Sequence, residues 1–142
     1  MAVAPKITQT VAQDLLTQFE TDLNSGTAAV IRGLDGSAPT NADDAETGTL
    51  GFTLTCSAAI FTSKTDGVPG AVGTFDTITQ DSSADNTITL SYFRILTQTG
   101  GTIRFQGSAG TASADMIVNT TAITSGSVVA ATGTSTLTVP EY

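Results

Sequence analysis

Two arginines in the stretch "SYFRILTQTGGTIRFQG" are the side chains whose type and spacing most suggest a binding role. If this stretch is a β-hairpin with a three-residue loop, Arg94 lies directly opposite Arg104. Like charges in that position are unfavourable by a few tenths of a kcal/mol up to about 1 kcal/mol, so an acidic or carbonyl acceptor should lie across them. The acceptor is either a group of this chain or a group of a neighbouring subunit.

The expected hairpin register depends on Gly100, placed in the left-handed conformation at the end of a Gln98-Thr99-Gly100 loop. This loop makes Thr97 face Gly101. The same alignment pairs Ile95 with Ile103 and Phe93 with Phe105, which puts the apolar pairs on one face of the hairpin. A slip of one residue would scramble these pairs. Upstream, Ile88 and Leu90 alternate in the opposite phase, which predicts a bulge or two-sided burial near Ser91.

Common catalytic chemistry is excluded by composition. The chain contains no histidine, so the Ser-His-Asp and Cys-His arrangements and histidine metal sites are unavailable. The one cysteine, Cys56, alternates in phase with Leu50, Phe52 and Leu54, and we expect it to be a small buried hydrophobe rather than a reactive thiol. We therefore expect no enzymatic activity.

Neither metals nor cofactors are indicated by the remaining polar residues. Two groups of carboxylates could surround a calcium ion, but neither has the spacing of an EF-hand, and solvated turns explain both. These groups are Asp76, Asp81 and Asp85, and separately Asp43, Asp44 and Glu46. The glycine-rich stretches lack the Gly-Lys-Ser/Thr sequence of a phosphate loop. We expect no cofactor and no metal.

The charge of the chain points to protein partners. Five Lys and Arg against thirteen Asp and Glu give 142 residues a net charge of −8, which disfavours nucleic acid or a membrane as the main partner. The first sixteen residues are interrupted by Pro5, Lys6, Gln9 and Asp14, so they do not resemble a signal peptide, and we expect a protein used without export. We expect one domain, 1–142, made of an arm and helix (1–25) and a β-domain (26–142).

One segment, 11–23, has the period of an amphipathic helix. Apolar residues recur every four positions, with Thr10 and Gln13 at the spacing of a capping box. The apolar stripe consists of Val11, Leu15, Phe19 and Leu23, widened by Ala12 and Leu16. A helix of this length is marginal alone, so the stripe should be covered by the sheet or by another chain. Leu15 and Phe19 are therefore candidate subunit-contact residues, together with Arg94 and Arg104.

The rest of the chain is rich in Thr, Ser, Gly and β-branched residues and predicts strands separated by turns. The clearest strand is 50–56, "LGFTLTC", and others are expected at 27–33, 75–80, 87–97, 102–107, 115–120, 127–131 and 134–139. The segments 35–48 and 62–73 are expected to be mobile contact loops. The pattern predicts a mainly β protein: an antiparallel β-sandwich or barrel-like domain with one N-terminal amphipathic helix.

The C-terminal half resembles small virion proteins of tailed bacteriophages that are encoded among head genes. Four elements carry the resemblance, namely Tyr92-Phe93-Arg94-Ile95, Gly100-Gly101-Thr102, Gly107-Ser108-Ala109-Gly110 and Ile123-Thr124-Ser125-Gly126. The resemblance implies a head decoration or cement protein on the capsid surface, assembled in the host cytoplasm. Its implied partners are the major capsid protein and copies of itself, as a homo-oligomer of which a trimer is one form.

Two other functions fit the composition. A tail tube or minor tail protein would share the acidic β-domain, and its position on tails rather than heads would distinguish it. A carbohydrate-binding β-sandwich would usually carry exposed aromatic residues, of which this chain has few, with no Trp and two Tyr.

Overall fold

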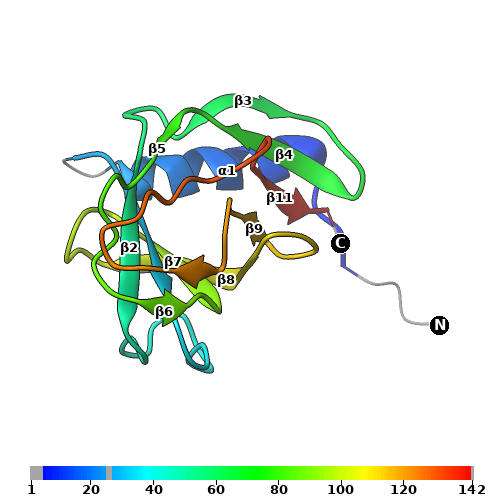
Figure 1. Cartoon of the computed structure of the whole chain (residues 1–142). Helices are drawn as coiled ribbons and strands as arrows, with labels where there is room; N and C mark the ends of the chain where they lie inside the picture. Colours follow the sequence, from blue (N-terminus) through cyan, green and yellow to red (C-terminus); the bar gives the residue numbers. More distant parts are fainter. Residues whose placement is uncertain (1–4, 25–26, 142) are drawn as a thin grey trace.

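A computed structural model describes residues 5–24 and 27–141. The described chain is mainly β with one N-terminal helix, which confirms the predicted fold class (Figure 1). The elements are α1 (Gln9–Leu23), β1 (Val30–Leu34), β2 (Leu50–Cys56), β3 (Phe61–Thr65), β4 (Gly70–Phe75), β5 (Ile78–Thr79), β6 (Ile88–Thr89), β7 (Tyr92–Leu96), β8 (Ile103–Gly110), β9 (Met116–Ile117), β10 (Ala122–Ile123) and β11 (Thr136–Pro140).

Helix α1 begins two residues earlier than the sequence pattern predicts. Its N-cap is Thr8 rather than Thr10, and the Thr8 hydroxyl oxygen accepts a hydrogen bond from the Val11 N–H at 3.4 Å. A threonine in this position satisfies one of the first four helical N–H groups, which have no partner within the helix. The helix ends at Leu23, and the N–H of the C-cap residue Asn24 donates to the Glu20 carbonyl at 3.0 Å.

The main sheet has six strands in the order β5-β2-β1-β7-β8-β9. Strand β2 occupies the predicted residues, and its alternation places Phe52 and Leu54 in the core with no exposed surface. The pairings are antiparallel except for β8 with β9, which are parallel. This parallel pair is the one departure from the expected antiparallel arrangement among the described strands.

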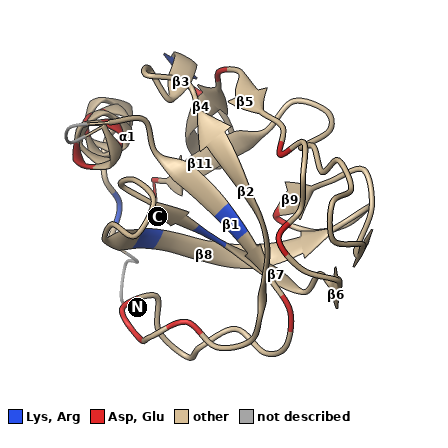
Figure 2. Ribbon diagram, turned by 60° about the vertical axis from the view of Figure 1, so that its left-hand side comes forward, with Lys and Arg blue, Asp and Glu red and all other residues tan. Residues whose placement is uncertain are grey.

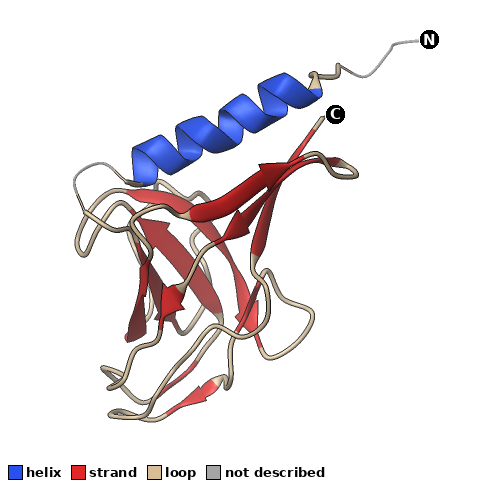
Figure 3. Ribbon diagram, turned by 90° about the horizontal axis from the view of Figure 1, so that it is seen from above, coloured by secondary structure: helices blue, strands red, loops and turns tan. Residues whose placement is uncertain are grey.

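A three-stranded sheet, β11-β4-β3, faces the main sheet, and β10 pairs with β6. Figure 3 shows α1 lying along the three-stranded sheet, close to the chain end that follows β11. Ala12 and Leu16 of the helix are completely buried. The helix therefore forms part of the core.

Two predicted segments differ from the structure. The segment 62–73, expected to be a mobile loop, instead contributes to the β3–β4 hairpin. The segment 127–131, expected to be a strand, makes only two isolated bridges, Asp81 with Val129 and Val118 with Ala131. Most side chains of 62–73 are small or polar and carry no apolar alternation, so its strands arise from pairing with each other and with β11 rather than from local preference.

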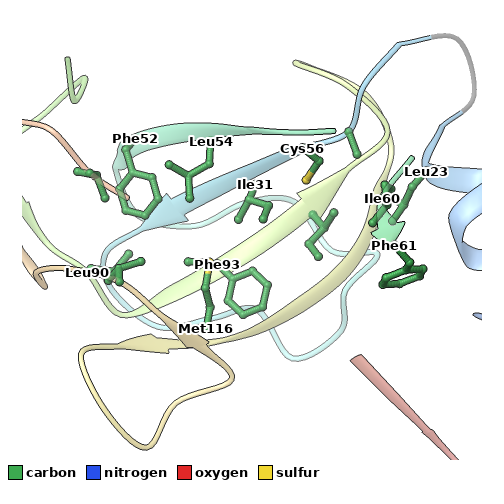
Figure 4. Close-up of a cluster of buried hydrophobic side chains, with 14 of the residues drawn as sticks. Leu23, Ile31, Phe52, Leu54, Cys56, Ile60, Phe61, Leu90, Phe93 and Met116 are labelled. Carbon is green, nitrogen blue, oxygen red and sulfur yellow. The ribbon is translucent and has the colours of Figure 1, made fainter. Parts of the chain in front are cut away.

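The core lies between the inner faces of the sheets and α1 (Figure 4). Close packing fixes at least one glycine: a Cβ at Gly33 would lie 2.3 Å from the ring of Phe52, its cross-strand partner. Across residues 5–24 and 27–141, no helix has the length and apolarity that crossing a membrane requires.

Candidate functional site

One side of α1 presents a row of apolar side chains to solvent. Ile7, Val11 and Leu15 are 37%, 43% and 49% exposed; Val11 and Leu15 lie one turn apart on α1, and Ile7 lies just before its N-cap Thr8. Core packing does not explain these three residues, because the buried side of the helix is formed by Ala12, Leu16 and Leu23. We call Ile7, Val11 and Leu15 the outer row.

The predicted stripe was wrong in treating Leu15 and Phe19 as one surface. A helix turns about 100° per residue, so residues four apart drift by about 40° at each step. Successive members of the stripe therefore rotate from solvent at Val11 to the core at Leu23. Phe19 is half-buried, with ring centroids 6.4 Å from both Phe61 and Phe105. The structure places Leu15 on an accessible surface and Phe19 between the two sheets.

Glu20 fixes the rotation of α1 about its axis. Its carboxylate forms an ion pair with Lys64 of β3 and accepts a hydrogen bond from the Phe61 N–H at 3.2 Å. Burial raises the pKa of Glu20, but the hydrogen bonds from Lys64 and Phe61 and the charge of Lys64 outweigh burial and leave the pKa below its ordinary value. This anchor keeps the outer row turned away from the sheet.

The predicted pairing of Arg94 with Arg104 is wrong. Arg94 faces Gln106, and the register shifts between Ile95 and Leu96, which pair with Phe105 and Ile103. Arg104 is therefore the extra residue of a β-bulge, and its side chain is exposed.

The hairpin loop explains the other part of the error. Gly100 is left-handed as predicted, with φ of 73°, but the Thr97 N–H donates to the Thr102 carbonyl, so the loop is one residue longer than expected. Loop and bulge together shift the register by two residues. A shift of two leaves each side chain on its original face, and Phe93 and Phe105 do pack together, with ring centroids 5.9 Å apart.

The cross-strand neighbour of Arg94 is Arg32 of β1. The acidic loop 35–48 supplies one acceptor to each arginine. Figure 2 shows how few basic positions there are, in blue, beside the more numerous acidic ones, in red. Arg94 is fully buried and donates from Nη1 to the Asp44 carbonyl at 2.8 Å and from Nη2 to Gln106 Oε1 at 2.9 Å. Arg32 Nη1 lies 2.9 Å from Glu46 Oε2. The acceptor of Arg94 is thus intramolecular.

Further contacts hold the loop on the outer face of the sheet. The Gln106 amide donates to the Pro39 carbonyl at 2.7 Å, and the Tyr92 hydroxyl donates to the Thr47 carbonyl. The expected mobile contact loop is therefore attached along its length to β7 and β8. No local sequence signal links Arg32 to Arg94, since their proximity depends on the pairing of β1 with β7.

The described residues contain no group of three or more His, Cys, Asp or Glu side chains arranged to hold a metal ion. Cys56 is buried, and burial raises its pKa to about 12, so its thiol stays protonated and unreactive near neutral pH. This confirms its predicted packing role.

The outer row is thus accessible to a partner, whereas both arginines are held by acceptors of the same chain. Comparison with family models, curated proteins and solved structures gave no match.

Proposed function

We propose that the protein is a structural virion component, a decoration or cement protein that binds the head shell of a tailed bacteriophage through the outer row of α1. The observation that carries this proposal is the row itself. Val11 and Leu15 on α1, and Ile7 just before its N-cap, are each more than a third exposed, whereas the opposite side of the helix already fills the core. Covering such a row with a complementary apolar surface gains roughly 25 cal/mol per Å² of buried apolar area.

The partner that fits this row is the major capsid protein, with a groove or patch that accepts an apolar helix face. Support comes from the resemblance of the β7–β8 hairpin region to head-gene proteins and from the acidic surface, which disfavours DNA as the bound species. Copies of this chain would lie side by side on the shell and make a homo-oligomeric layer.

The first test is location. Particles are purified from cells that make the chain, heads are separated from tails, and the chain is counted in each fraction. The proposal expects many copies per head and none on tails. A chain confined to tails would favour a tail tube or minor tail protein, and absence from both fractions would end the virion proposal.

The second test is the contact. Leu15→Asp should abolish binding to undecorated heads, because it would bury an unpaired charge in the interface. Thr17→Asp adds the same charge at an exposed position off the outer row and should bind as the wild type does. Equal binding by both variants would show that α1 is not the contact.

A further inference from the structure

A cavity of about 290 Å³ lies where the six-stranded sheet and β11 approach each other. Its walls are mostly apolar and include Phe75, Phe93, Phe105, Met116 and Leu137. Figure 4 shows Phe93 and Met116 close together on the inner side of the sheet. A second cavity of about 280 Å³ lies beside the first and shares Phe75, Ile78 and Ser135 with it. The two cavities adjoin at these shared residues, and we call them together the cleft.

The cleft borders the edge of β11 and not only its inner face. Four consecutive residues, 135–138, line the first cavity, although successive side chains of a strand point to opposite faces. Ser135 and Leu137 are partly buried and face inward, whereas Thr136 and Thr138 are exposed. A cavity that touches both sets must lie against the strand's backbone.

Among residues 5–24 and 27–141, the backbone groups on that edge at Thr136 and Thr138 have no hydrogen-bond partner. β11 is an outer strand of its sheet, with β4 as its neighbour on one side. The Phe75 N–H donates to the Ser135 carbonyl at 2.9 Å, so in this antiparallel ladder Ser135, Leu137 and Val139 direct their peptide groups towards β4. Thr136 and Thr138 therefore direct theirs towards the cleft.

Pro140 has the same phase as Thr136 and Thr138, on the edge side of the ladder. Proline is tolerated there because its missing N–H removes no bond to β4. The free stretch therefore ends at Pro140, and it offers two N–H and two C=O groups to an added strand.

Each part of the cleft carries a carboxylate. Asp115 lines the first cavity, where its Oδ2 accepts hydrogen bonds from the Ser108 N–H at 2.8 Å and the Ser108 hydroxyl at 2.7 Å. Asp76 lines the second and accepts from the Thr77 N–H at 2.7 Å. These bonds hold the pKa of both carboxyl groups below the ordinary value, so both are negative at neutral pH.

We infer that this cleft binds an extended peptide segment of a partner protein, which adds as a strand to the free edge of β11 and inserts a large apolar side chain flanked by basic residues. The free edge of β11 can form hydrogen bonds with a peptide backbone, and the apolar walls can pack around a large inserted side chain. The two carboxylates can pair with the flanking basic residues. This second contact surface does not involve the outer row, and it stands or falls separately from the proposed virion function.

The probe is the fluorescein-labelled peptide Thr-Lys-Val-Phe-Val-Lys-Thr, whose two lysines share a strand face with the phenylalanine, amidated at its C-terminus and titrated with the full chain. We expect saturable anisotropy below about 1 mM protein. Replacing both lysines by glutamates should abolish binding, and the wild-type affinity should fall as salt rises. Hydrogen exchange should slow at the Thr136 and Thr138 amides when the peptide binds, because those N–H groups become paired.

Two variants of the chain test the two halves of the site. Thr138→Pro removes an N–H on the free edge that makes no bond to β4, so the sheet is kept and peptide binding should weaken about tenfold. Thr138→Ala keeps this N–H and should bind normally. Ser135→Phe should fill the cavity and abolish binding, with Thr65→Phe on β3 as its control.

Unfolding curves of each variant establish that the fold is kept, and Thr138→Pro keeps the test decisive if Ser135→Phe does not fold. The inference is overturned by a peptide that fails to bind at about 1 mM. It is also overturned if Thr138→Pro and wild type bind equally, or if a peptide methylated on its backbone nitrogens binds as tightly as the unmodified one, since the cleft would then accept a side chain without strand addition.

Discussion

Arg94 and Arg32 are direct neighbours on adjacent strands, and one acidic loop supplies an acceptor to each of them. The loop carbonyl of Asp44 binds the fully buried Arg94, and the carboxylate of Glu46 binds the partly exposed Arg32. Two like charges are thus accommodated within the chain, with no neighbouring subunit involved in either contact.

Arg94→Gln should destabilise the isolated protein. The shorter side chain breaks the hydrogen bonds from the buried Arg94 guanidinium to the Asp44 carbonyl and to Gln106 Oε1, and a hydrogen bond from a charged group contributes about 1.5–3 kcal/mol. The free energy of unfolding in urea measures the effect. Arg104→Gln, at the exposed bulge, is the control and should change that free energy by less than about 0.5 kcal/mol. Equal losses in the two variants would contradict the assigned register.

Acid should weaken the attachment of α1 to the sheet. The folded pKa of Glu20 lies below its ordinary value of 4.5, so its stabilising contribution is complete above about that pH and is lost as the pH falls through the folded pKa. Wild type and Glu20→Gln should therefore differ in stability at pH 7 and converge at lower pH. A difference that stays constant down to pH 2.5, roughly two units below that value, would rule out this linkage.

The two sides of α1 should respond differently to the same substitution. Phe19→Asp places a charge among Phe61 and Phe105 and should cost about 3 kcal/mol or more of stability. Leu15→Asp should cost less than about 1 kcal/mol, because nearly half of Leu15 is exposed. Thermal unfolding of both variants gives the comparison, and similar losses would mean that the outer row is buried in solution.

Cys56 should be protected from alkylation in the folded protein. Burial raises its pKa to about 12 and blocks access, so modification by iodoacetamide at pH 8 requires unfolding of β2. The labelling rate, followed by mass spectrometry, should increase sharply in denaturant at the same midpoint as global unfolding. Rapid labelling in buffer alone would contradict this burial.

Local patterns predicted the elements whose residues alternate or repeat clearly. The strand 50–56 was predicted at its observed bounds, because four apolar residues occupy every second position. The left-handed Gly100 was also correct. The β3–β4 hairpin was missed, since its strands are stabilised by partners distant in sequence and carry mostly small or polar residues.

The candidate site shows the same limit. Apolar patterning fixes which face a residue occupies, but it is insensitive to a shift of two residues, which is why Arg104 was misplaced while Phe93 and Phe105 were correctly put together. The position of Arg32 beside Arg94 depends on a long-range strand pairing, and the exposure of Leu15 depends on the angle at which α1 meets the sheet. Neither is encoded in a short stretch of sequence.

Because most basic side chains are bound by acceptors of the same chain, few of them remain to attract the acidic groups of another copy. Of the five basic residues, Arg32, Lys64 and Arg94 are held by acceptors of the same chain, which leaves Lys6 and Arg104 as the cations whose side chains have neither an ion pair nor a hydrogen bond among the described residues. At a distance, the net charge of −8 therefore makes copies of the protein repel one another. Light scattering should give a positive second virial coefficient in dilute buffer that falls towards zero as added salt shortens the Debye length. Close approach of two copies would then depend on counterions as much as on contacts.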